Sequence, residues 1–179
     1  LGTFICLIPQ RAVDAVLGTG QWKEIVQAAH HVLAGTSERR ALTEYPGGAL
    51  DSLTPRALST PRHLAYLKIS EGCDNPCAFC AIPLMRGRHV GRSVEHIVDE
   101  AKGLADQGVK ELVVIGQDTT YFGLDTNGVR NLPQLLQKLA DIDGIEWVRL
   151  MYAYPAKFPD GVLDIIAGHP NICKYMDMP

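Results

Sequence analysis

The sequence has no apolar run long enough to cross a bilayer, which takes about 20 consecutive apolar residues. Its apolar opening, residues 1–9, has neither a basic flank before it nor a small-residue cleavage site after it, as a secretory signal would. It also lacks an excess of one charge, since 17 basic and 20 acidic side chains give a formal net charge of −3. We therefore expect neither membrane association nor strong nucleic-acid binding.

The sequence also lacks the even, dispersed cysteines of a secreted disulfide scaffold. It has five cysteines, of which Cys73, Cys77 and Cys80 crowd into eight residues while Cys6 and Cys173 stand alone. This pattern favours a metal site in a reducing compartment, so we expect a cytoplasmic protein. Apolar residues make up 46% and charged residues 21% of 179 residues, a composition typical of a folded globular chain rather than a disordered one.

Buried strands alternate with amphipathic helices from residue 63 onward. Apolar runs predict strands over 64–69, 112–115, 147–150 and 174–176, and helical spacing predicts helices over 94–105, from about 132, and from Pro159. Strands with continuous apolar runs, separated by helices, are typical of βαβ units with a parallel sheet. We therefore expect an α/β fold, a partial (β/α) parallel barrel with three complete units and the start of a fourth.

A second, smaller α/β unit is predicted before this barrel. Residues 13–17 read as a strand, and the apolar residues between 22 and 33 recur at helical spacing. Periodicity then disappears among prolines and glycines, as in a linker. We thus divide the chain into the end of a small α/β domain (1–35), a linker (36–62) and a truncated barrel domain (63–179).

Chemistry in parallel α/β sheets sits beyond the carboxyl ends of the strands, an edge called the rim below. The predicted strand ends bring Cys73 and its two neighbouring cysteines, then Gln117 and Asp118, then residues 152–154 and Asp177 to this rim. Three thiolates from one loop can hold three corners of a cuboidal iron-sulfur cluster and leave the fourth iron open. The alternative is a zinc-binding module without catalysis, in which Cys173 or His89 completes the usual four ligands.

The spacing Cys73-x-x-x-Cys77-x-x-Cys80, with the aromatic Phe79 before the last cysteine, resembles the signature of radical S-adenosylmethionine (SAM) enzymes. Within that superfamily the chain resembles the RimO family of ribosomal-protein methylthiotransferases, most specifically over 60–123. The resemblance is carried by the following segments: Thr60-Pro61-Arg62-His63, Tyr66 to Cys77, Ile82-Pro83 with Arg86-Gly87, Gly116 to Tyr121 with Gly123, and Arg149-Leu150 to Tyr154-Pro155.

The resemblance implies an activity and its cofactors. The implied activity is methylthiolation of the β-carbon of an aspartate in a small-subunit ribosomal protein, with an electron donor as a second partner. The implied cofactors are a 4Fe-4S cluster on the three cysteines, SAM, and an auxiliary 4Fe-4S cluster held by three amino-terminal cysteines in the full-length protein. Only Cys6 lies in that region here. Phe79 is a candidate contact of SAM. Gln117 and Asp118 are placed at the rim to contact SAM or the target carboxylate, although Asp118-Thr119-Thr120 is also an ordinary turn sequence. No classical acid-base residue is required, and none is assigned.

A sister family, which methylthiolates isopentenyl-adenosine in tRNA, is the nearest alternative. Its members typically read Gln-Asn-Val after the second strand and His-Pro after the third, whereas this chain reads Gln117-Asp118-Thr119 and Tyr154-Pro155. We expect this stretch of chain alone to cleave SAM slowly at most, without completing methylthiolation. A basic stripe of Arg86, Arg88 and Arg92 is a candidate contact for an acidic or RNA-rich ribosomal surface, although a solvated loop is the favoured explanation.

Overall fold

A computed structural model of the chain describes residues 14–35, 40–42 and 57–179. Cys6 and most of the predicted linker lie outside these residues. The helices are η2 (Trp22–Glu24), α1 (Ile25–Leu33), α2 (Ile82–Arg86), α3 (Val94–Asp106), η3 (Thr119–Tyr121), α4 (Leu124–Asn127), α5 (Leu132–Ala140) and α6 (Val162–Gly168). The strands are β1 (Ala15–Leu17), β2 (Arg40–Leu42), β3 (Leu64–Lys68), β4 (Ser70–Glu71), β5 (Val90–Gly91), β6 (Glu111–Ile115), β7 (Trp147–Leu150) and β8 (Ile172–Met176).

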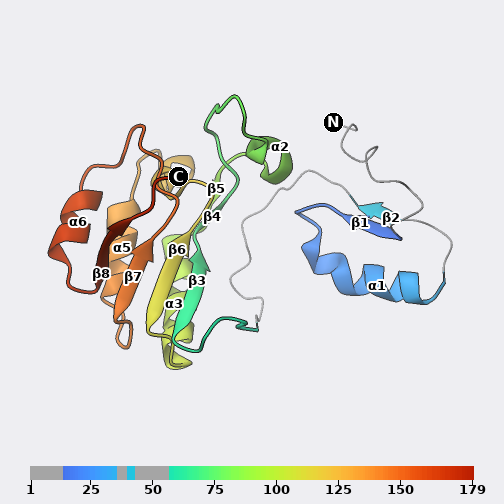
Figure 1. Ribbon diagram of the computed structural model, residues 1–179, viewed down its shortest axis with the longest axis horizontal. Helices are drawn as coiled ribbons and strands as arrows, with labels where there is room; N and C mark the ends of the chain where they lie inside the picture. Colours follow the sequence, from blue (N-terminus) through green and yellow to red (C-terminus); the bar gives the residue numbers. More distant parts are fainter. Residues whose placement is uncertain (1–13, 36–39, 43–56) are drawn as a thin grey trace.

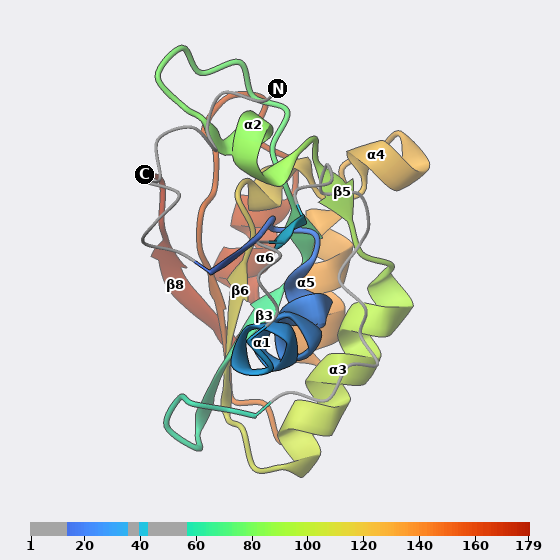
Figure 2. The ribbon, with the colours of Figure 1, turned by 90° about the vertical axis from the view of Figure 1, so that its right-hand side faces the viewer.

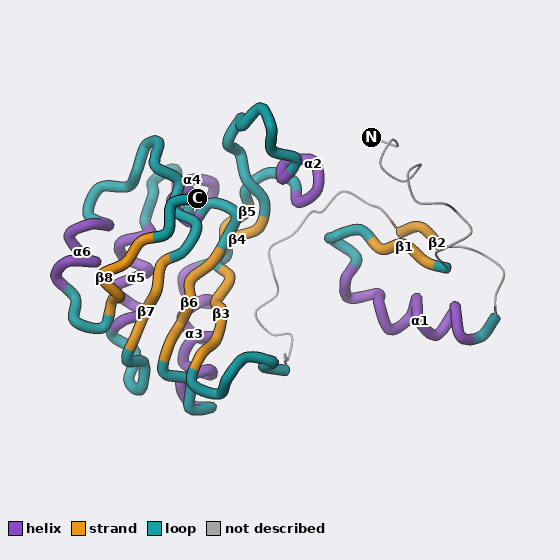
Figure 3. Tube along the Cα trace, in the orientation of Figure 1, coloured by secondary structure: helices purple, strands orange, loops and turns teal. Residues whose placement is uncertain are grey.

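The main sheet has four parallel strands in the order β3-β6-β7-β8. Helices α3, α5 and α6 follow β3, β6 and β7 in the chain and cover one face of this sheet (Figure 1). The order of strand and helix is that of three βα units and a fourth strand, which confirms the predicted partial parallel barrel. Figure 3 shows the strands side by side, with all of their carboxyl ends at the same edge.

The core lies between the sheet and its three helices. Alternate residues of β3, β6 and β7 are fully buried on this side, for example Leu67 in β3, Leu112 in β6 and Leu150 in β7. They pack with the inner faces of α3 and α5, such as Ile97 and Leu136. Each of these large side chains contributes about 1.5–3 kcal/mol by leaving water, so the sheet-helix core fixes the rim as a firm edge.

Two predicted boundaries are corrected by the structure. Helix α6 begins at Val162 rather than at Pro159, because Gly161 takes a left-handed conformation (φ +81°) that separates the preceding turn from the helix. Strand β2 pairs in parallel with β1 although it lies inside the predicted linker. Residues 40–42 are too short a run for periodicity to reveal, and β1 supplies their backbone partners.

No helix in the described ranges combines the length and apolar character needed to cross a membrane.

Candidate active site

The three clustered cysteines lie on a loop that leaves the rim after β4 and returns through α2 to β5. Residues 72–81 are called the cysteine loop below; Figures 1 and 2 show it with α2 at the carboxyl end of the main sheet. The loop is closed at its base, where Cys73 N donates to Gly87 O at 3.2 Å. Gly72 has φ +75°, and a Cβ there would lie only 2.1 Å from Arg88 O, so this close approach requires glycine.

The three thiols differ in their surroundings. Cys73 is buried, with 9% of its surface exposed, while Cys77 and Cys80 are partly exposed, and all three are free of disulfides. Burial raises the pKa of the Cys73 thiol, and hydrogen bonds from Asn75 oppose that rise. Tyr154, in the segment after β7, also contacts the cysteine loop. Its hydroxyl forms a hydrogen bond with Cys77, and this bond raises the pKa of Tyr154.

Asn75 and Asp118 join the cysteine loop to the end of β6. Asn75 donates to the Cys73 sulfur from its backbone N at 3.5 Å and from Nδ2 at 3.4 Å, and Nδ2 also donates to Asp118 Oδ2 at 2.8 Å. The other Asp118 oxygen accepts from the backbone N and the hydroxyl of Thr120 at 2.9 and 2.6 Å. Asp118, predicted to contact the cofactor, therefore has both carboxylate oxygens engaged by the protein itself.

The loops after β6, β7 and β8 are also bonded to one another. Thr119 N donates to Tyr152 O at 3.1 Å, and Tyr152 N donates to the Asp177 carboxylate at 3.0 Å. Tyr152 has φ +56°, an uncommon conformation for a non-glycine residue that these two contacts hold in place. The rim residues predicted from strand ends thus form one connected edge.

Gln117 and Phe79 are the two predicted cofactor contacts with a side-chain group that the described part of the chain leaves available, a buried oxygen without a hydrogen-bond partner and an exposed ring. Gln117 Oε1 is buried and lacks a hydrogen-bond partner within the part of the chain that is described. A buried acceptor without a donor costs free energy, about 1–3 kcal/mol, which a bound polar ligand can recover. The Phe79 ring is 95% exposed, so the described residues leave it open to a ligand.

His89 packs against Tyr121 and Asp125. Its side chain is fully buried, its ring lies 4.8 Å from that of Tyr121, and its Nε2 is 3.7 Å from Asp125 Oδ1. Burial lowers the pKa of His89, although the charges of Asp125, Asp118 and Asp74 oppose the effect.

A ready-made site for a single metal ion is not found among the described residues, which contain no group of three or more Cys, His, Asp or Glu side chains placed around one ion. Among these residues, His89 and Cys173 are thus not grouped with the loop thiols around one point. A single zinc ion needs all its ligands within about 2.3 Å of one point, whereas a 4Fe-4S cluster takes each thiolate at a different iron. Three free thiols spread along one rim loop fit the cluster as a donor set better than they fit zinc.

The basic stripe is neutralised by neighbouring acids. Arg86 lies 3.5 Å from Glu71, Arg88 pairs with Asp74 at 3.1 Å, and the buried Arg92 pairs with Glu100 at 2.7 Å. Burial alone would raise the pKa of Asp74, but hydrogen bonds from Arg88 and from the backbone of His89 outweigh it and lower that pKa. Arg92 therefore braces α3 from within the fold, whereas Arg86 and Arg88 remain 41% and 82% exposed beside the cysteine loop.

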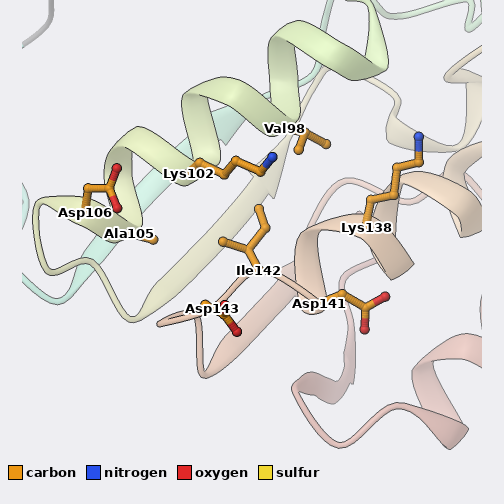
Figure 4. A pocket seen from close by; sticks show the side chains of 8 residues that line it. All are labelled: Val98, Lys102, Ala105, Asp106, Lys138, Asp141, Ile142 and Asp143. Atoms are coloured by element: carbon orange, nitrogen blue, oxygen red, sulfur yellow. The ribbon is translucent and has the colours of Figure 1, made fainter.

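A cavity of about 510 Å³ lies between α3 and α5, away from the rim. Figure 4 shows its lining, which includes Lys102 and Lys138 as well as Asp106, Asp141 and Asp143. These charges of both signs lie at the end of the helices opposite the cysteine loop, so the cavity is not part of the rim site.

Sequence reasoning missed Asn75 and Tyr154 as partners of the thiols. Asn75 stands two residues after Cys73, a spacing at which an asparagine can hydrogen-bond back to the turn it belongs to, and this signal was available. Tyr154 was placed at the rim by its strand, but only the fold brings it to Cys77.

The chain was compared with protein families and known proteins. A family model described as "Radical SAM superfamily" matches residues 67–171. A protein named "Ribosomal protein uS12 methylthiotransferase RimO" from Cytophaga hutchinsonii is 59% identical over 124 residues, covering 69% of this chain and 28% of that protein. A protein of the same name from Desulforamulus reducens is 46% identical over 167 residues, covering 93% of this chain and 37% of that protein.

The chain thus spans roughly a third of the length of the curated relatives it matches, between 28% and 37% for these two. Among solved structures, a radical SAM methyltransferase, TsrM, from Kitasatospora setae is similar with a TM-score of 0.48 and 21% identity. The match covers 66% of this chain and 24% of that one.

Proposed function

The chain belongs to the radical SAM superfamily, and on that premise we propose that it is the cluster-binding part of a RimO-type methylthiotransferase. The observation that carries the proposal is the set of three free thiols on one rim loop, Cys73, Cys77 and Cys80. Identities of 46–59% to proteins named uS12 methylthiotransferases support the RimO type.

In this proposal the three cysteines hold a 4Fe-4S cluster, and Gln117 and Phe79 contact SAM. When bound, the cluster supplies an electron for reductive cleavage of SAM, the chemistry that the protein itself does not provide. Gln117 Oε1 offers a buried acceptor to a donor of the cofactor, which its lack of a protein partner supports. The exposed ring of Phe79 offers an apolar cover. Asp118 orients the loop through the bonds that its oxygens accept from Asn75 and Thr120, and its contact with SAM stays a prediction.

We propose the β-carbon of an aspartate in ribosomal protein uS12 as the target, with an electron donor as the second partner. The names of the relatives support uS12 as the substrate protein. Nucleic-acid binding by this part of the chain is not expected to be strong, because Arg86, Arg88 and Arg92 all have acidic partners. Free thiols at Cys77 and Cys80 that remain partly exposed support a reducing, cytoplasmic setting.

The substrate is tested with a full-length RimO-type protein that contains this chain, because the chain alone is expected to cleave SAM slowly at most. The anaerobically reconstituted protein is mixed with SAM, dithionite and a uS12 peptide deuterated at the β-carbon of its target aspartate. The expected result is 5′-deoxyadenosine that carries deuterium, because hydrogen abstracted from that carbon ends on the 5′ position. A matched peptide with asparagine in place of the aspartate is the control. SAM cleavage without any deuterium transfer would leave the superfamily chemistry standing but contradict this substrate.

A further inference from the structure

We propose that Asn75 is a positioning residue that holds the Cys73 sulfur and raises the reduction potential of the cluster bound there. The inference rests on the proposed function, in which Cys73 is a cluster ligand. Asn75 directs two N–H donors at this sulfur, its backbone N at 3.5 Å and its Nδ2 at 3.4 Å. Both distances are within the range of hydrogen bonds to sulfur, which are longer than those to oxygen.

The orientation of the Asn75 amide is fixed by Asp118. Asp118 Oδ2 lies 2.8 Å from the amide nitrogen, and an ionised carboxylate only accepts hydrogen bonds, so the nitrogen and not the oxygen must face it. Asp118 is itself 2% exposed and held by two bonds from Thr120. One amide nitrogen therefore serves both the carboxylate and the sulfur, and rotation of the amide would break both contacts.

Hydrogen bonds to cysteine sulfur are among the factors that set the potential of an iron-sulfur cluster. A donor at the sulfur stabilises the extra negative charge of the reduced cluster, so it favours reduction. Cys73 is the most buried of the three loop thiols, and a hydrogen bond is electrostatically stronger where water is excluded. A residue that only filled space in the loop would have no such effect on the potential.

The test is the midpoint potential of the anaerobically reconstituted cluster in Asn75→Ala and Asn75→Asp, measured by redox titration. Both variants lose the Nδ2 donor, and Asn75→Asp keeps the side-chain size while placing a carboxylate there. We expect the ratio of reduced to oxidised cluster at a fixed potential to fall about tenfold in Asn75→Ala, equivalent to about 59 mV for one electron, and further in Asn75→Asp. Asp118 is left unchanged because it also caps η3 through Thr120.

The control is Asn127→Ala, an exposed asparagine at the end of α4, which should keep the wild-type potential. Clusters with the wild-type potential in both Asn75 variants would overturn the inference and leave the proposed function intact. A wild-type chain that assembles no cluster would overturn the proposed function and the inference with it. Loss of iron binding in the Asn75 variants would support the positioning role if these variants keep the wild-type circular dichroism and Asn127→Ala binds iron. Cys73 would then no longer be held where it can ligate the cluster.

Discussion

At the scale of single residues, cysteines at different places in the fold have different surroundings. Cys73, Cys77 and Cys80 lie at the rim, whereas Cys173 lies inside strand β8, where burial raises the pKa of its thiol. The sequence predicted this contrast from spacing alone, because three thiols within one loop can serve one inorganic group. Spacing could not reveal that Asp118 is held by Asn75, since these two residues, 43 apart in the sequence, meet only in the folded chain.

The first prediction concerns iron loading. Replacing any one of Cys73, Cys77 or Cys80 with alanine should reduce the iron retained after reconstitution at least about tenfold, because two thiolates do not hold a cuboidal cluster firmly. Iron and sulfide analysis after gel filtration measures the effect. Cys173→Ala is the matched control and should load as the wild type does; equal iron in all four variants would refute the assignment.

The second prediction concerns pH and His89. Burial lowers the pKa of this histidine below its ordinary value of 6.5, so the unfolded chain takes up the proton first as the pH falls. Stability from neutral His89 should therefore be present above about pH 6.5 and be lost progressively between that pH and the lower pKa of the folded state.

Thermal melts of the chain from about pH 8 to about pH 5 measure this dependence. His89→Phe, which keeps a ring beside Tyr121, should melt with a shallower dependence on pH than the wild type. His96→Ala, on the exposed side of α3, should keep the wild-type slope. If the slope is the same in His89→Phe and in the wild type, His89 is not the group responsible.

At the scale of elements, the long elements of the barrel could be predicted and the short ones could not. Strand β6 is buried along nearly its whole length, and α3 begins at an N-cap, Ser93, whose hydroxyl accepts from His96 N at 3.3 Å. A periodic pattern of apolar residues can be recognised only over a segment of several residues. The β4–β5 pair, with two residues in each strand, and the five-residue helix α2 are instead fixed by tertiary contacts such as that between Gly72 and Arg88.

The third prediction tests that contact. Gly72→Ala should destabilise the chain by about 3 kcal/mol or more, because the new Cβ would be forced into Arg88 O at a positive φ. Gly103→Ala, within α3 and with nothing near its added Cβ, should instead stabilise it by about 0.5–1 kcal/mol. Urea denaturation measures both changes. A Gly72→Ala variant as stable as the wild type would mean that the loop base is not held as the structure has it.

At the scale of the whole molecule, one parallel sheet explains why residues far apart in the sequence share a site. The segments that follow β3, β6, β7 and β8 meet at the same edge because these parallel strands all end there, and the β4–β5 pair extends the segment after β3 into the cysteine loop. The core between the sheet and α3, α5 and α6 stabilises this edge. The cysteine loop lies beyond the edge, next to α2 (Figure 2). The fold thus presents an open set of three thiols beside Gln117, whose buried oxygen lacks a partner in the described part of the chain.

The central claim is that these three thiols hold a redox-active iron-sulfur cluster, and metal analysis of the anaerobically reconstituted chain tests it most directly. The account predicts a brown protein with about four irons and four sulfides per chain that bleaches on reduction with dithionite. It also predicts that the reduced protein releases 5′-deoxyadenosine from SAM. A colourless protein that carries one zinc per chain and leaves SAM intact would contradict the account and favour a zinc-binding module.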